Sequence, residues 1–206
     1  MEPTAEILNF TDNLVAAVQS ATGQRLDLTP ETLPFLDYYG QIYRGSRDKK
    51  FTKDRAAAEN LSLLLAPMGG AYFGQVIHAK YACQWHAPLQ SYGEWRIQFE
   101  HCFLYFNPVA VAMEVFNQKE MKGWPAAFET RPEDEAWLCS ILDELGRVSV
   151  EDYYTFSVRW EILDTVVARL ETAEIMERGP GSCESLKLYN DADYESFIRR
   201  LTAGRR

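Results

Sequence analysis

The stretch Arg55–Phe106 most constrains the fold, because its hydrophobic pattern changes period part-way along. Its first half carries apolar residues at helical spacing, among them Leu61, Leu64 and Leu65. From Trp95 onward apolar and polar residues alternate, which is typical of a strand with one buried face. A helical period followed by a strand period predicts helices packed around a small antiparallel sheet. We therefore expect an α+β fold.

Apolar spacing and end signals predict five to seven helices and locate the sheet. One helix is expected over about 54–81, with a kink or break at Pro67 and the pair Gly69-Gly70. A charged, glycine-containing loop is expected before it, over 45–53. The sheet is expected to centre on 82–106, with 81–88 pairing with a strand that runs from Trp95 through Phe106. The other expected helices cover 4–21, 30–44, 109–117, 132–145, 149–177 and 191–201.

Length and cysteine usage indicate a single domain in a reducing compartment. The 206 residues suffice for a self-contained core, and we expect one α+β domain with a C-terminal helical half from about residue 131. No apolar run approaches the ~18 residues of a membrane span, and the N-terminus lacks the features of a signal peptide. The four cysteines are scattered, which favours reduced thiols. We expect a cytoplasmic protein that does not enter a membrane.

The charge balance and the aromatic residues bear on partners. A net charge of −9 opposes binding to nucleic acid, because contact with phosphates requires a basic surface. An acidic surface permits a basic protein partner, and large aromatic side chains are common anchors of interfaces. Tyr38, Tyr39, Tyr153 and Trp160 do not fall on single helical stripes with their aromatic neighbours, so we predict that some of them lie at a protein interface.

The candidate chemical cluster comprises His78, Cys83, His86, His101 and Cys102, which fall within 25 consecutive positions. Cys83 and His86 have a spacing found in zinc sites. No second pair of this kind accompanies them, and neighbours such as His101 and Cys102 on one strand would face opposite sides of the sheet. The sequence therefore favours partly buried histidines and inert thiols, and we expect no metal and no cofactor.

The same region is the basis of the alternative hypothesis, in which the protein is a hydrolase-type enzyme that uses residues 78–102. A cysteine nucleophile needs a histidine in contact with it and a third polar group that orients the histidine. Cys83 with His101, or Cys102 with His86, would meet this requirement only if the fold brought them together. No nucleophile motif surrounds either cysteine.

Glycines mark the middle of the organising stretch. The segment 69–74 has three glycines but lacks the Gly-x-x-x-x-Gly-Lys-Ser/Thr pattern of a phosphate loop, and it follows a helical pattern. We expect Gly70 and Gly74 to lie where a neighbouring element approaches the backbone closely. Tyr72 and Val76 are expected in the core or at its border.

Two short motifs carry a resemblance to known proteins. The first is Leu26–Leu33, with the sequence LDLTPETL, followed by Leu36-Asp37; the second is Gly70–Ile77, with the sequence GAYFGQVI, followed by Trp85. Together they resemble a family of bacterial domains of unknown function over about residues 26–116. The resemblance implies helices before a small sheet, and it implies no established activity and no catalytic residues. The family pattern has an acid where this chain has Gln75, so no carboxylate chemistry is expected there.

No catalytic motif emerges from the chain. We therefore expect a non-enzymatic cytoplasmic binding or regulatory protein that acts through protein–protein contact, with the hydrolase as the alternative. The identity of the partner and the oligomeric state are left open by the sequence.

Overall fold

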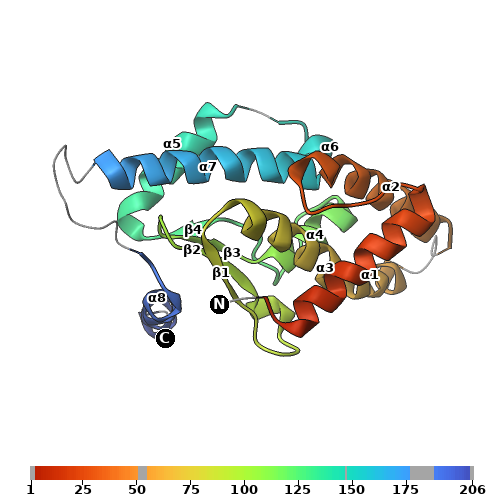
Figure 1. Cartoon of the computed structure of the whole chain (residues 1–206), viewed down its shortest axis with the longest axis horizontal. Coiled ribbons are helices and arrows are strands. Elements are labelled where there is room, and N and C mark those ends of the chain that lie inside the picture. Colours follow the sequence, from red (N-terminus) through yellow and green to blue (C-terminus); the bar gives the residue numbers. More distant parts are fainter. Residues whose placement is uncertain (1–2, 51–54, 147, 177–187, 205–206) are drawn as a thin grey trace.

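A computed structural model describes residues 3–50, 55–146, 148–176 and 188–204. Over these residues the chain forms eight α-helices and one four-stranded antiparallel sheet (Figure 1), which confirms the α+β prediction but exceeds the five to seven helices expected. The helices are α1 (Ala5–Thr22), α2 (Leu33–Lys50), α3 (Arg55–Lys80), α4 (Pro108–Asn117), α5 (Pro132–Glu144), α6 (Val150–Tyr153), α7 (Phe156–Met176) and α8 (Asp191–Gly204). The strands are β1 (Cys83–His86), β2 (Arg96–Phe99), β3 (Leu104–Phe106) and β4 (Glu129–Thr130).

Several predicted helix boundaries are wrong. The helix α3 continues through Pro67 without a break, because its second half is buried against α1 and α4 and this packing outweighs a local breaking signal. The loop expected over 45–53 is helical as far as Lys50, where α2 ends. Residues 51–54 lie outside the described residues.

The helix expected over 149–177 is divided into α6 and α7. The backbone leaves the helical region at Tyr154, with φ −91° and ψ 45°. A new helix start is supplied by Asp37 of α2, whose carboxylate accepts hydrogen bonds from the amides of Phe156 at 2.6 Å and Ser157 at 3.1 Å. A side chain distant in sequence therefore caps α7.

The glycines of α3 lie where other elements approach its backbone. A Cβ atom at Gly70 would lie 2.6 Å from the Cα atom of Val109 in α4. A Cβ atom at Gly74 would overlap the indole ring of Trp85 in β1. Both close approaches were expected, and Tyr72 and Val76 are buried as predicted. The glycines thus serve helix packing rather than a phosphate-binding loop.

The sheet is a meander with the strand order β1-β2-β3-β4. The expected pairing of β1 with β2 is confirmed, with Trp85 opposite Ile97 and His86 opposite Arg96. The expected single strand from Trp95 to Phe106 is wrong, because the chain reverses between β2 and β3. The core-facing residues change from odd to even positions at this reversal, and the continuous apolar run 103–106 conceals the change.

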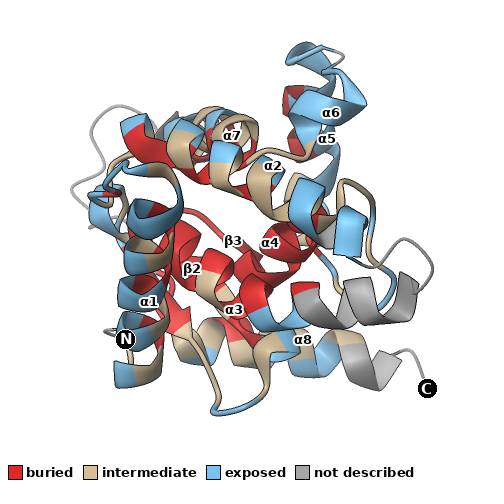
Figure 2. Ribbon diagram, turned by 90° about the vertical axis from the view of Figure 1, so that its right-hand side faces the viewer, coloured by how far each residue is buried: buried red, intermediate tan, exposed pale blue. Residues whose placement is uncertain are grey.

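Two apolar clusters cover the two faces of the sheet. The inner face contributes residues such as Trp85, Ile97 and Phe106 to the main core, which reaches from α1 to α7. On the outer face, α8 places Tyr194 against Phe103 of the β2–β3 turn, with ring centroids 4.4 Å apart. Figure 2 shows burial concentrated in α3, α4 and the strands, whereas α5 and α6 are mostly exposed. None of the described helices combines the length and apolar character needed to cross a bilayer.

Candidate functional site

The structure does not assemble the predicted histidine and cysteine cluster into one site. His78 lies near the end of α3, Cys83 and His86 occupy opposite faces of β1, and His101 and Cys102 lie in the turn between β2 and β3. Among the described residues, no three of these five bring ligand atoms together. His86 instead faces acidic residues of α8, and His101 lies 3.8 Å from Glu171 of α7.

The two cysteines of this cluster are unsuited to nucleophilic catalysis. Burial, together with the nearby charge of Glu100, raises the pKa of Cys83 to about 12. Burial likewise raises the pKa of Cys102 well above its usual range, reinforced by Glu171 and other acids. In the described part of the chain, no hydrogen bond joins either thiol to a histidine. A thiol held protonated and without a base is not an activated nucleophile, which weighs against the hydrolase hypothesis.

The first motif of the family resemblance has a structural role. The Asp27 carboxylate accepts hydrogen bonds from the backbone amide and the hydroxyl of Thr29, at 3.0 and 2.7 Å. Its hydrogen bond with the Thr29 side chain lowers the pKa of Asp27. The amide of Leu28, which has a positive φ of 66°, donates to the hydroxyl of Tyr72 in the second motif at 3.1 Å. The two motifs therefore join the segment before α2 to α3.

The second motif is also used for packing. Gln75 accepts a hydrogen bond from the indole nitrogen of Trp85 at 3.3 Å. Both side chains are buried, at 7% and 1% exposure. An amide at this position satisfies a buried indole N–H without burying a charge. The motif residues thus hold β1 against α3 and form no reactive cleft.

Among the described residues, exposed large apolar side chains are most numerous on α5, α6 and the residues between them. Of the twelve large apolar side chains that are exposed among the described residues, six belong to residues 137–153. Exposed apolar side chains scattered singly are normal on a protein surface, whereas contiguous ones mark contact sites. These six are Trp137, Leu142, Leu145, Val148, Val150 and Tyr153. We call them the α5–α6 apolar surface.

Two cavities that share part of their lining lie beside Leu142, Leu145, Val148 and Tyr153 of this surface, and we call the pair the groove. The first, about 330 Å³, is lined mainly by apolar residues, including Leu142, Leu145 and Val148. The second, about 350 Å³, contains Trp124 and Glu120. Both cavities share Ala126, Ala127, Tyr153 and Arg159. The groove therefore has an apolar chamber and an aromatic, acidic chamber, separated by Tyr153 and Arg159.

Arg159 holds the partition of this groove in place. Its guanidinium carbon lies 3.8 Å from the centroid of the Tyr153 ring, and its Nη1 donates to the Tyr153 hydroxyl at 2.8 Å. Its Nη2 donates to the buried carboxylate of Glu114 on α4. Burial raises the pKa of Glu114, and the charge of Arg159 opposes this shift. A buried ion pair between α7 and α4 therefore positions the wall between the two chambers.

The four aromatic residues predicted at an interface lie in different environments. Tyr153 lines both chambers of the groove and is 37% exposed. Tyr38 is 53% exposed on α2, and Tyr39 is partly buried against the main core. Trp160 is only 6% exposed and packs in the core beside Tyr81, so its proposed place at an interface is corrected. Composition alone could not distinguish these environments.

A larger cavity of about 560 Å³ adjoins α5, α7 and the β2–β3 turn, and its charged groups are already paired. Arg131 donates from Nε to Asp134 at 2.6 Å, from Nη1 to the Tyr189 hydroxyl at 2.8 Å and from Nη2 to Glu174 at 3.0 Å. Each nitrogen of the guanidinium therefore has an acceptor within the protein. This network joins α5 to α7, and it occupies the Arg131 guanidinium that could otherwise bind an anion.

Comparison of the chain with protein-family models, with curated protein sequences and with solved structures found no match. The family resemblance based on residues 26–116 therefore stays a prediction. Any functional proposal must come from the geometry described above.

Proposed function

We propose that this protein is a non-enzymatic binding or regulatory protein that acts through protein–protein contact at the α5–α6 apolar surface and its groove. The observation that carries the proposal is the concentration of exposed apolar side chains beside two adjoining cavities. Buried pockets flanked by aromatic side chains are typical of the energetic centre of a protein interface. Among the described residues, the Arg131 guanidinium is paired and the thiols of Cys83 and Cys102 are buried, so neither offers a comparable surface.

The charge of this region supports a basic partner. Residues 132–153 contain seven carboxylates and one basic residue. Six of these carboxylates are exposed: Glu133, Glu135, Asp143, Glu144, Glu151 and Asp152. An apolar groove beside acidic helices complements an amphipathic helix that carries apolar anchors on one face and Lys or Arg beside them. We therefore propose a basic, amphipathic protein segment as the occupant.

Each chamber would bind a different type of side chain from that segment. The apolar chamber beside Leu142 and Val148 would take an apolar anchor. The second chamber, with Glu120 at its rim and the rings of Trp124 and Tyr154 in its wall, would take a cationic side chain. Such a side chain gains from the acid and from the aromatic faces together.

A peptide titration tests this proposal. The probe is a fluorescent amphipathic helix of Leu and Lys, and binding is followed by fluorescence anisotropy at physiological salt. We expect saturable binding to the natural protein and at least tenfold weaker binding to Leu142→Asp and Val148→Asp. Each substitution adds negative charge and so favours general attraction of the cationic peptide. A loss of binding therefore reports the loss of apolar contact.

Leu89→Asp is the matched control, because Leu89 is 75% exposed but lies in the loop after β1 and lines neither chamber. It should bind the peptide as the natural protein does. Equal binding by all four proteins would show that charge alone attracts the peptide. That result, or no binding at all, would refute the groove as the contact site.

A further inference from the structure

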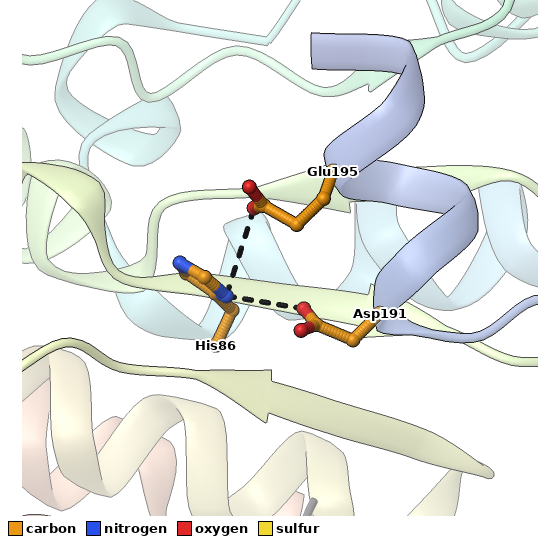
Figure 3. Close-up of side chains that lie close together, drawn as sticks. All are labelled: His86, Asp191 and Glu195. Atoms are coloured by element: carbon orange, nitrogen blue, oxygen red, sulfur yellow. Dashed lines mark hydrogen bonds and ion pairs between the residues drawn. The ribbon is translucent and has the colours of Figure 1, made fainter. Parts of the chain in front are cut away.

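His86 and two acids of α8 form a compact group on the outer face of the sheet. His86 is the last residue of β1, and Asp191 and Glu195 lie one turn apart on the same side of α8. Figure 3 shows the Nδ1 atom of the imidazole directed at both carboxylates, while the other ring nitrogen points away from them. Among the described residues, this is the one group of three His, Cys, Asp or Glu residues whose ligand atoms all lie within 4.8 Å of one another.

The distances within the group suit a metal ion. Nδ1 of His86 lies 3.0 Å from Oδ1 of Asp191 and 3.7 Å from Oε1 of Glu195. A tetrahedral zinc ion with bonds of about 2.1 Å separates its ligand atoms by roughly 3.4 Å. The two observed distances lie on either side of this value. These two separations would reach the zinc value by shifts of a few tenths of an ångström, and the ligand oxygens of the two acids lie within 4.8 Å of each other.

The scaffold holds these ligands in register. Tyr194, between the two acids in the sequence, is fully buried, and its hydroxyl oxygen accepts a hydrogen bond from the amide of Leu104 at 3.2 Å. The same hydroxyl lies 2.7 Å from the carbonyl oxygen of Phe99. The start of α8 is capped by Asn190, whose side chain accepts from the amide of Ala192 at 2.9 Å. His86 is thus held by a strand and the two acids by a helix, which favours a preorganised site.

Arg96 of β2 contacts one of these side chains, Glu195. It lies opposite His86 in the sheet, and its Nη2 atom donates to Oε1 of Glu195. The same oxygen lies 3.7 Å from Nδ1 of His86, so a metal at this place would share Oε1 with Arg96 unless the carboxylate turns to offer Oε2 to the guanidinium. Outer contacts of this kind orient ligating side chains. The side chains of His86, Asp191 and Glu195 are 24%, 39% and 29% exposed, so an ion and a water molecule can enter.

We propose that His86, Asp191 and Glu195 form a binding site for a divalent transition metal, with zinc as the probe. One imidazole and two carboxylates form a ligand set that zinc accepts, and solvent would complete the coordination. The proposal departs from the expectation of no metal. It also replaces the thiol partners considered for His86 with carboxylates about a hundred residues away in the sequence.

Isothermal titration of the chelator-treated full chain with zinc tests the site. We expect one zinc ion per chain and at least tenfold weaker binding in both His86→Ala and Asp191→Asn. His101→Ala is the matched control, because His101 is also partly exposed and lies near one carboxylate, that of Glu171. It should bind zinc as the natural protein does. Magnesium, which prefers an octahedral shell of oxygen ligands, should not bind measurably under the same conditions.

Thermal denaturation provides the second measurement. Zinc at a concentration near the dissociation constant of the natural protein should raise the melting temperature of the natural protein and of His101→Ala more than that of Asp191→Asn, because a ligand of the folded state stabilises it in proportion to its occupancy. Asp191→Asn changes one partly exposed oxygen to an amide and keeps the shape of the side chain, so the test does not depend on His86→Ala folding. Absence of saturable zinc binding, or full stoichiometry retained in both site variants, would overturn the proposal. In the latter case the zinc would lie elsewhere, and the group would be an ion pair only.

Discussion

Gly70→Ala is the substitution whose effect the structure defines most directly. The added Cβ atom would lie 2.6 Å from the Cα atom and 2.7 Å from the backbone nitrogen of Val109. Carbon atoms pack best about 3.5–4.0 Å apart, so α4 would have to move away from α3. The obstacle is helix backbone at a fully buried residue, which cannot turn aside as a flexible side chain would.

The size of the effect follows from two opposing contributions. Overpacking of a core costs about 1–3 kcal/mol, and we expect the upper end here because the neighbour is backbone. Alanine in place of glycine within a helix returns about 1 kcal/mol. The free energy of unfolding should therefore fall by about 2 kcal/mol. At roughly 2–4 °C per kcal/mol for a chain of this size, the melting temperature should drop by about 4–8 °C.

Gly45→Ala is the internal control for this prediction. Gly45 also lies within a helix, α2, but a Cβ atom there would have no neighbour within 4 Å. The substitution there brings only the higher helix propensity of alanine, so the melting temperature of Gly45→Ala should rise slightly. Thermal denaturation followed by circular dichroism measures both variants. A melting temperature for Gly70→Ala at or above that of the natural protein would refute the close-packing argument.

Two further predictions concern the thiols and the net charge. In a Cys183→Ser background, a thiol reagent at about pH 8 should modify the exposed Cys139 quickly, and Cys83 and Cys102 only after unfolding, because burial raises the pKa of both and excludes the reagent. Rapid modification of all three in the folded protein would contradict the burial described here. With its net charge of −9, the protein should show no saturable binding to DNA or RNA by fluorescence anisotropy at physiological salt. Binding that weakens steeply with added salt would reveal an overlooked basic face.

Local signals in the sequence determined many of the element boundaries. Asn107 before Pro108 predicts the start of α4, and its side chain accepts hydrogen bonds from the amides of Val109 at 2.8 Å and Ala110 at 2.9 Å. Gly146 directly follows the helix expected over 132–145 and has a φ of 77°, which glycine adopts without strain. These features depend on contacts among neighbouring residues. The sequence contains all the information needed to predict them.

The close approaches at Gly70 and Gly74 were also predictable, because a missing Cβ atom inside a helical pattern has a steric consequence. The sequence did not indicate which elements would approach. Val109 and Trp85 reach these glycines only because α4 and β1 pack on the same helix. The same limit applies to the start of α7. Its capping group, Asp37, is 119 residues away from Phe156.

Tertiary structure alone decided both candidate sites. His86 stood out in the sequence, but its partners Asp191 and Glu195 were hidden in an ordinary helical pattern until α8 packed across the sheet. Likewise, the apolar residues of α5 predict a buried helix face, and only the arrangement of the neighbouring helices leaves Leu142 and Leu145 exposed. Hydrophobic periodicity records which face of an element is apolar. Whether another element of the same chain covers that face depends on contacts between distant residues, which a local pattern does not contain.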